Sequence, residues 1–178
     1  MRKVVAFAFS SLDGVAEAPD GFVTGWDDVL DASGATLIAT QDAVILGRRS
    51  YDEWVEFWPG SEIEPFATFI NGVEKYVATS TPLEREWANT TVIDGDLVQF
   101  VRDLKDRPGG DIGVHASISV IQTLLAGGVV DELRLAIAPV IAGSGRRLLD
   151  GLPSIRLESI RSVTSPSGHL LVDYRPIE

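Results

Sequence analysis

The alternation of short apolar runs with amphipathic segments constrains the fold of this chain more than any other feature of its sequence. Residues 4–9 and 43–46 are short and almost continuously apolar, which is typical of strands buried on both faces of a sheet. Segments with apolar residues at helical spacing follow such runs, and this order occurs four times before residue 127. The pattern predicts a parallel sheet with helices on both faces.

The last third of the chain has a different pattern. Strands without helices follow residue 131, and residues 165–168 (Ser-Pro-Ser-Gly) are typical of a hairpin turn. We therefore predict one α/β domain over residues 1–178, with three layers and a central mixed sheet that is mostly parallel and has an antiparallel C-terminal hairpin. The predicted strands are residues 4–9, 43–46, 75–78, 91–93, 112–114, 132–141, 156–164 and 169–174, the predicted helices are residues 26–38, 49–54, 97–105 and 117–126, and the main loops are residues 10–25 and 59–65.

The charge balance and the absent cysteine exclude several kinds of function. Lys and Arg total 15 against 26 Asp and Glu, so the net charge is −11. This balance argues against nucleic acid and anionic membrane surfaces as partners. Without cysteine there is no disulfide, thiolate nucleophile or cysteine-based zinc site. His115 and His169 are too isolated in the sequence to indicate a metal site, so no metal is expected.

No segment of the sequence predicts a membrane span or a secretion signal. No apolar run approaches the ~20 residues of a transmembrane helix. The run at residues 4–9 is too short for the core of a signal peptide. We expect a cytoplasmic protein that acts on a small molecule.

Three strand ends carry small, polar or basic residues that could bind phosphate groups. In a parallel sheet, ligands bind beyond the carboxyl ends of the strands. Residues 47–50 (Gly-Arg-Arg-Ser) join a strand to a helix, where free N–H groups and guanidinium groups attract phosphate. Residues 79–81 offer hydroxyl groups, and residues 113–117 lead into the clearest helix. Each is also an ordinary turn, but together they could follow one dinucleotide.

Other phosphate-binding motifs are missing or ambiguous. The sequence has no G-x-G-x-x-G after the first strand and no P-loop motif, which argues against a Rossmann domain and a P-loop enzyme. Residues 143–147 (Gly-Ser-Gly-Arg-Arg) have a composition typical of a phosphate-binding loop. A loop that approaches a neighbouring chain explains them equally well.

At these positions the chain resembles the dihydrofolate reductases and the reductase domain of the bifunctional riboflavin-biosynthesis enzyme. The likeness covers nearly the whole chain and is nearest to the stand-alone bacterial branch of the riboflavin type. It rests on the order and spacing of short segments: residues 11–14 (Ser-Leu-Asp-Gly), 46–51 (Leu-Gly-Arg-Arg-Ser-Tyr), 75–80 (Lys-Tyr-Val-Ala-Thr-Ser), 113–117, 130–133 (Val-Asp-Glu-Leu), Pro139-Val140, Gly143-Ser144-Gly145 and Leu148.

The resemblance implies a dihydrofolate-reductase-like fold and an NADPH site. Gly47, Arg48, Arg49 and Ser50 would lie at the pyrophosphate. Thr79 and Ser80 would lie at the adenosine 2′-phosphate, and Gly113, Ala116, Ser117 and Ile118 would line the nicotinamide and diphosphate end. The family often has glycine where this chain has Ala116, whose Cβ would crowd the approach of a ligand to the backbone.

A nicotinamide supplies a hydride, so the protein needs to align the reactants and provide a proton. Asp13 in the first loop is one candidate proton donor; it is also typical of an Asp-Gly turn. Asp31 follows Trp26 by five residues, a spacing similar to that of the substrate-binding acid of folate reductases. As one of three acids at a helix start, Asp31 could instead stabilise the helix dipole. Ser11, Trp26, Tyr51 and Trp54 are the candidate substrate contacts, although aromatic residues more often form a core.

We compared three functions with these features. The first is an NADPH-dependent reductase of a small heterocyclic, carbonyl or imine substrate, such as a pterin-like or pyrimidine-like compound. The second is a ligand-binding protein of the same fold without turnover, which Ala116 and the lack of an obvious acid favour. The third, a flavodoxin-like FMN module, disagrees with the late antiparallel strands. The apolar strand at residues 133–141 could form a homodimer contact.

Overall fold

A mixed sheet forms the centre of the computed structural model, which describes residues 1–177. Within these residues the sheet has eight strands in the order β4-β3-β2-β5-β1-β6-β8-β7. Six neighbouring strands, β4 to β6 in this order, run parallel, and β8 and β7 run antiparallel at one edge. The strands are β1 (Val4–Ser11), β2 (Gln41–Gly47), β3 (Glu74–Ala78), β4 (Thr90–Val92), β5 (Asp111–His115), β6 (Glu132–Ala138), β7 (Arg156–Thr164) and β8 (Leu170–Ile177).

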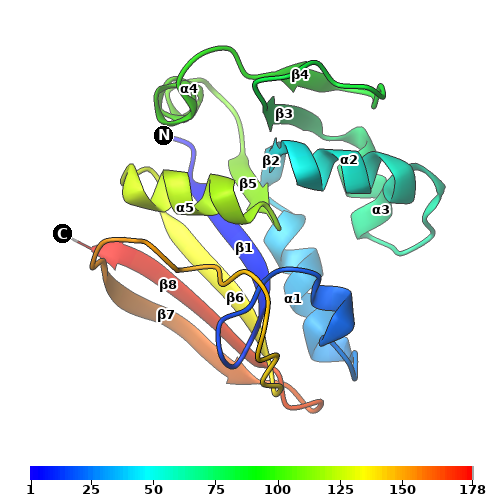
Figure 1. Cartoon of the computed structure of the whole chain (residues 1–178), viewed down its shortest axis with the longest axis vertical. Coiled ribbons are helices and arrows are strands. Elements are labelled where there is room, and N and C mark those ends of the chain that lie inside the picture. The colour runs from blue at the N-terminus through cyan, green and yellow to red at the C-terminus, as the bar shows by residue number, and fades with distance from the viewer. Residues whose placement is uncertain (178) are drawn as a thin grey trace.

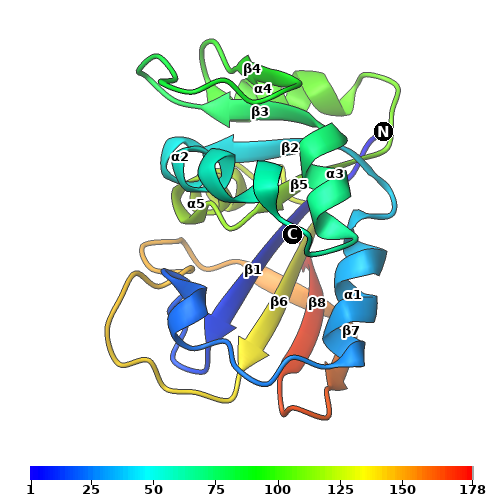
Figure 2. The same ribbon diagram turned by 90° about the vertical axis from the view of Figure 1, so that its right-hand side faces the viewer.

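Helices cover both faces of the sheet, so the fold has three layers (Figures 1 and 2). The α-helices are α1 (Asp28–Ile38), α2 (Arg48–Phe57), α3 (Phe66–Gly72), α4 (Leu97–Lys105) and α5 (Ile118–Ala126), and the 3₁₀ helices are η1 (Pro19–Gly21) and η2 (Trp58–Gly60). Helices α4 and α5 pack on one face, while α1, α2 and α3 pack on the other. The two cores share the sheet as a common wall.

The sequence of β1 explains why this strand lies at the centre of both cores. Successive side chains of a strand point to opposite faces of the sheet. Val4 and Ala6 pack into the core under α4 and α5, whereas Val5 and Phe7 pack against α1 and α3. A strand that is apolar at every position is stable only where both faces are covered. Because β1, β2, β3 and β5 run parallel, their carboxyl ends meet at one edge of the sheet.

The predicted fold class and the antiparallel C-terminal strands are confirmed, whereas one helix was missed and the end of one strand is corrected. Helix α3 was not predicted. Strand β6 was expected to run to Ile141 but ends at Ala138, because Pro139 has no N–H group for the ladder and the Val140 amide turns back to the Ala138 carbonyl at 2.8 Å.

The position of β6 also bears on the expected homodimer contact. Both edges of β6 are paired within the chain, to β1 and β8. Strand β6 is therefore closed to edge-to-edge pairing with a second copy, and β7 is the free antiparallel edge among the described strands. None of the helices in residues 1–177 combines the length and the apolar character needed to span a membrane.

Candidate functional site

A cavity of about 1280 Å³ lies at the carboxyl ends of the parallel strands. Its walls come from β1, β5 and β6, from the loop after β1, and from helices α1, α2, α5 and the start of α3. One end is polar and lies where α2 and α5 begin. The other is apolar and lies between α1, α3 and the end of α2. A separate hollow of about 390 Å³ lies behind α2, beside Tyr51 and Trp87.

The N-termini of α2 and α5 meet at the polar end of the cavity. The Gly47 amide donates a hydrogen bond of 2.9 Å to the Ser117 Oγ, which joins the residues that precede the two helices. A Cβ at position 47 would lie 3.3 Å from the Val120 Cγ2, so glycine permits this close approach. Neither helix has a side chain bonded to its first-turn amides. Two uncapped helix N-termini side by side form a favourable site for an anion.

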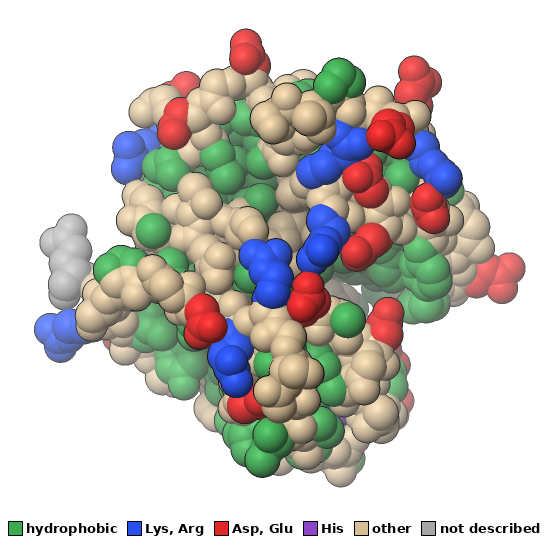
Figure 3. All heavy atoms as spheres, viewed as in Figure 1, with side chains coloured by type: hydrophobic (Ala, Val, Ile, Leu, Met, Phe, Trp, Pro, Cys, Tyr) green, Lys and Arg blue, Asp and Glu red, His purple; other side chains and the backbone are tan. Residues whose placement is uncertain are grey.

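Arg49 and Arg146 add positive charge to this end of the cavity. The Glu17 carboxylate accepts hydrogen bonds from the Arg49 side chain and the Arg146 backbone amide. The Arg49 Nη1 donates to the Glu17 Oε1 at 2.9 Å, while the Arg146 amide donates to the Glu17 Oε2 at 3.1 Å. The Arg146 guanidinium reaches the Ser119 Oγ on α5 at 2.9 Å. Figure 3 shows basic and acidic side chains close together across the middle of this face. The loop after β1 is thereby tied across the polar end.

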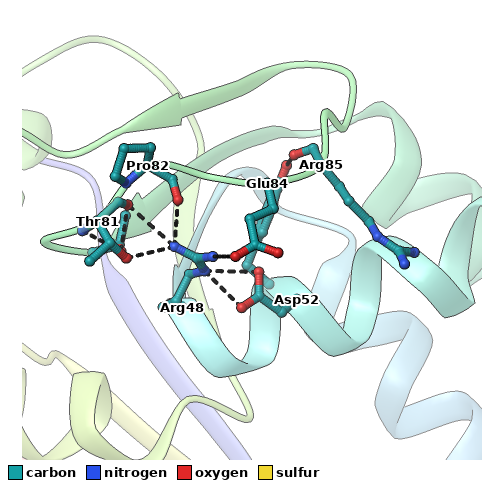
Figure 4. A network of polar contacts seen from close by, with 8 residues as sticks. Arg48, Asp52, Thr81, Pro82, Glu84 and Arg85 are labelled. Atoms are coloured by element: carbon teal, nitrogen blue, oxygen red, sulfur yellow. Dashed lines mark hydrogen bonds and ion pairs between the residues drawn. The ribbon is translucent and has the colours of Figure 1, made fainter.

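Arg48 also lines the cavity, but its guanidinium is committed to protein groups (Figure 4). Its Nε contacts both carboxylate oxygens of Asp52, one turn along α2, at 2.9 and 2.7 Å. Its Nη1 donates to the Thr81 Oγ1 at 2.7 Å and to the Pro82 carbonyl at 2.6 Å. Arg48 therefore holds the turn after β3 against α2 and has few free donors for a ligand.

The predicted hydroxyl pair Thr79 and Ser80 lies in this same turn, next to the cavity wall formed by Ala78. The Thr79 Oγ1 donates to the Thr81 carbonyl at 3.0 Å and accepts from the Thr81 amide at 3.2 Å. Ser80 is exposed. Both lie just outside the cavity, beyond its polar end, so a 2′-phosphate role for them stays a prediction.

At the third strand end, Ala116, Ser117 and Ile118 line the cavity, whereas Gly113 lies inside the sheet. Ala116 has φ 57°, a left-handed conformation that favours glycine. A Cβ at Gly113 would lie 2.7 Å from the His115 Nε2. Gly113 therefore makes room for the buried Gln41 and His115 side chains and does not line the cavity, and its assignment to the cofactor stays a prediction.

The apolar end of the cavity is an inner chamber with mostly aromatic and aliphatic walls. Its members are Phe7, Phe9, Leu30, Ser33, Gly34, Leu37, Trp54, Phe57, Trp58, Ile63, Phe66, His115, Ala136 and Leu171. Phe66 contacts the rings of Trp54, Trp58 and His115 at centroid distances of 5.7, 4.7 and 5.6 Å. These edge-to-face and tilted contacts fix the aromatic walls in place.

His115 is the one titratable side chain of this chamber within the described chain. It is 2% exposed, and its Nε2 lies 2.8 Å from the Gln41 Oε1. Burial lowers the pKa of His115 from 6.5 to about 4, so the imidazole is neutral at pH 7. The sequence left His115 open between a structural and a cofactor-loop role, and the structure places it in the chamber wall.

Asp13 and Asp31, the two predicted proton donors, both lie outside the cavity, so a catalytic role for either one stays a prediction. The Asp13 carboxylate accepts from the Ser11 hydroxyl at 2.6 Å and from the amides of Ala142 and Gly143 at 2.9 Å each. These hydrogen bonds, Ser11 first, lower the pKa of Asp13 to about 2. Asp31 is exposed and accepts from the Trp26 indole at 2.6 Å. Neither carboxylate lines the cavity.

Of the four predicted substrate contacts, the structure brings only Trp54 to the cavity. Ser11 is buried beneath the first loop and bonds to Asp13. Trp26 is 56% exposed and packs beside Phe9. Tyr51 is fully buried on the sheet side of α2, where its hydroxyl donates to the Arg85 carbonyl at 2.8 Å.

Sequence reasoning missed the cavity face of α1 and the contribution of the loop before Leu148. Leu30, Ser33, Gly34 and Leu37 line the cavity at the spacing i, i+3, i+4, i+7, which is one face of a helix. That spacing was available in the sequence. Arg146 belongs to the Gly-Ser-Gly-Arg-Arg segment, which the sequence left open between phosphate binding and contact with a neighbouring chain, and it reaches the cavity beside α5.

Comparisons with known proteins agree with this architecture. Residues 2–171 match the family model of the RibD C-terminal domain. The uncharacterized protein YyaP of Bacillus subtilis (strain 168) is 31% identical over 180 residues, which cover 97% of this chain and 94% of YyaP.

Two solved structures share the fold at low sequence identity. A Shewanella sp. PV-4 protein provisionally assigned to riboflavin biosynthesis superposes with a TM-score of 0.81 at 19% identity, over 99% of both chains. The Thermotoga maritima diaminohydroxyphosphoribosylaminopyrimidine deaminase/5-amino-6-(5-phosphoribosylamino)uracil reductase gives 0.68 at 16% identity, over 99% of this chain and 57% of that one. These likenesses show a reductase-like fold, and the family model shows that the chain belongs to the RibD C-terminal domain family.

Proposed function

We propose that this protein is an NADPH-dependent reductase that transfers a hydride to a small heterocyclic, carbonyl or imine substrate. The observation that carries the proposal is the hydrogen bond between Gly47 and Ser117. It places two uncapped helix N-termini at one end of a cavity whose other end is an aromatic chamber. An anionic dinucleotide and a planar substrate would then lie end to end.

The residues at the polar end fit the charge and shape of a dinucleotide. The first-turn amides of α2 and α5 would bind the pyrophosphate, and Arg49 would exchange Glu17 for a phosphate oxygen. The closeness of Gly47 to Val120 leaves the backbone itself, not a side chain, facing the ligand. When bound, NADPH would supply the hydride, and the chain would align the two reactants and exclude water.

A ligand-binding role without turnover is the second candidate, and two observations favour it. Ala116 keeps a Cβ at a left-handed backbone position that lines the cavity. No carboxylate of residues 1–177 lies in the inner chamber to deliver a proton. Under this reading the nucleotide would bind and no substrate would be reduced.

Nucleotide titrations separate these functions. We expect the tryptophan fluorescence to respond to NADPH at lower concentration than to NADH or FMN. Gly47→Ala should weaken the binding of NADPH, because the added Cβ contacts Val120 and Ser117. Gly72→Ala should leave it unchanged, because a Cβ at position 72 has no other atom within 4 Å. NADPH binding without oxidation across a panel of heterocycles would indicate the role without turnover. If none of the three nucleotides bound, both candidate functions would be overturned.

A further inference from the structure

Helix α1 presents no charge to the inner chamber. Its cavity face consists of Leu30, Ser33, Gly34 and Leu37, and its acids point elsewhere. Asp31 lies one residue away from Leu30, which turns it by about 100° around the helix and out of this face. The Ser33 hydroxyl is therefore the one polar side chain that α1 offers to a ligand within the described residues.

The charged groups of the cavity all lie at its polar end or at its rim. They are Arg48, Arg49, Arg146, Glu17, Asp20 and Glu53. The three arginines are engaged near α5, the loop after β1 and the turn after β3. Asp20 and Glu53 are exposed to solvent. A phosphate in the inner chamber would thus be buried among aromatic rings without a cation, which is strongly unfavourable.

Polar recognition inside the chamber is limited to neutral groups. His115 is neutral at pH 7. If its Nε2 carries the proton that bonds the Gln41 Oε1, its Nδ1 is a hydrogen-bond acceptor. Together with the Ser33 hydroxyl, this ring can recognise the edge of a heterocycle but cannot neutralise a charge.

Gly34 leaves space in the chamber at the expense of helix stability. A Cβ at this position would meet nothing within 4 Å. A helix with glycine in its interior is less stable than one with alanine, and here no close packing requires the glycine. The open space lies on the cavity face of α1, opposite the aromatic walls from α2 and α3.

We propose that the inner chamber takes a neutral, unphosphorylated, planar heteroaromatic substrate, held between aromatic rings and recognised at its edge by Ser33 and His115. This inference rests on the proposed function, because the arginines are assigned to the nucleotide. The proposed substrate differs from 5-amino-6-(5-phosphoribosylamino)uracil, the compound named for the Thermotoga maritima reductase. That compound carries a phosphate group. Aromatic walls and a neutral polar edge match a fused two-ring heterocycle.

The test compares two probes, quinoxaline and 5-amino-6-(5-phosphoribosylamino)uracil, by tryptophan fluorescence with and without NADPH. Two of the four tryptophans, Trp54 and Trp58, line the chamber and report on it directly. We expect quinoxaline to bind at lower concentration than the phosphorylated probe. Tighter binding of the phosphorylated probe, or no binding of quinoxaline up to its solubility limit, would overturn the inference.

A matched pair of variants on α1 localises the binding. Gly34→Leu places an isobutyl group in the chamber, and Ala32→Leu places the same group on the exposed side of the helix. Both should fold, since leucine is a good helix former. Quinoxaline binding should weaken at least tenfold in Gly34→Leu alone, with NADPH affinity unchanged in both. Equal quinoxaline binding in the two variants would contradict the proposed location.

The two proposals fail in distinguishable ways. If the unmodified protein did not bind NADPH, the proposed reductase function would be wrong. Binding of quinoxaline that depends on Gly34 would still show that the chamber is a ligand site. Normal NADPH binding together with preference for the phosphorylated probe would retain the reductase and remove the neutral-substrate assignment.

Discussion

The amide of Gly47 donates a hydrogen bond of 2.9 Å to the Oγ of Ser117, and this bond joins the starts of α2 and α5. The two residues are 70 positions apart in the chain, at the ends of the neighbouring strands β2 and β5. Because the strands are parallel, both helices begin on the same side of the sheet. The electrostatics of the polar end depend on this pair.

Replacing Ser117 with alanine should weaken both the fold and nucleotide binding. The partly buried Gly47 amide would lose its acceptor, which costs about 1 kcal/mol. The free energy of unfolding from urea titration measures this loss. Ser154→Ala is the control, because Ser154 is exposed and lies outside the cavity. Equal stability of the two variants would contradict a structural role for the Gly47–Ser117 bond.

Glu17→Gln should tighten the binding of NADPH. The Glu17 carboxylate occupies the Arg49 guanidinium and the Arg146 amide, so it competes with a phosphate for the same donors. Removing its charge should lower the dissociation constant several-fold at low ionic strength, with a smaller change at high ionic strength. Glu53→Gln is the matched control, since Glu53 lines the cavity but forms no ion pair within residues 1–177. Weaker binding in Glu17→Gln would show that Glu17 supports the nucleotide site.

Ala116→Gly should stabilise the protein and improve nucleotide binding. A residue with a Cβ in the left-handed region loses about 1 kcal/mol relative to glycine there, and Ala116 has φ 57°. Removing this Cβ also widens the cavity at the start of α5. Thermal unfolding and NADPH titration measure the two effects. Ala18→Gly, at φ 48°, should give a similar gain in stability, which provides a reference for the effect of a left-handed backbone on stability.

The polar end of the site was predictable from sequence because its residues are adjacent in the chain. Residues 47–50 and 116–118 each lie where a parallel strand meets a helix, and the strand-end rule brings such segments to one edge. The alternation of apolar runs predicted the fold class for the same local reason. The packing at Gly113 was not predictable in this way, because the Gln41 side chain that fills its space comes from the neighbouring strand.

The chemistry of the inner chamber was less predictable because it depends on which way side chains face. Tyr51 and Trp54 are three residues apart on α2, yet one packs in the core and the other lines the cavity. The role of Asp13 is set by two amides about 130 residues further along the chain. No local pattern reports such partners.

Asp13→Asn should destabilise the first loop without changing the pH dependence of any reduction. The substitution removes the charge that accepts from the amides of Ala142 and Gly143, so these hydrogen bonds weaken. We expect faster proteolysis in the loops around residues 12–25 and 139–147. The pH profile of turnover with a reducible substrate should keep its midpoints. A lost or shifted midpoint in the variant would identify Asp13 as a proton donor.

The buried imidazole of His115 should make folding stability depend on pH in a defined window. Its pKa is lowered to about 4 in the folded protein, whereas an unfolded chain has the ordinary value near 6.5. Between these values the unfolded state binds a proton that the folded state does not, so stability rises with pH. The contribution is complete above pH 6.5 and is lost progressively as the pH falls to about 4.

The size of this effect is up to about 3 kcal/mol, since each unit of pKa difference corresponds to about 1.4 kcal/mol. His115→Gln removes the titrating group, so its free energy of unfolding should vary less between pH 4 and 6.5. His169 is present in both proteins, which leaves His115 as the difference. Asp13, with its pKa lowered to about 2, loses its stabilising charge only at lower pH. Parallel stability curves for the two proteins across pH 4–6.5 would mean that the chamber is hydrated enough to charge the imidazole, which would weaken the assignment of a neutral ligand.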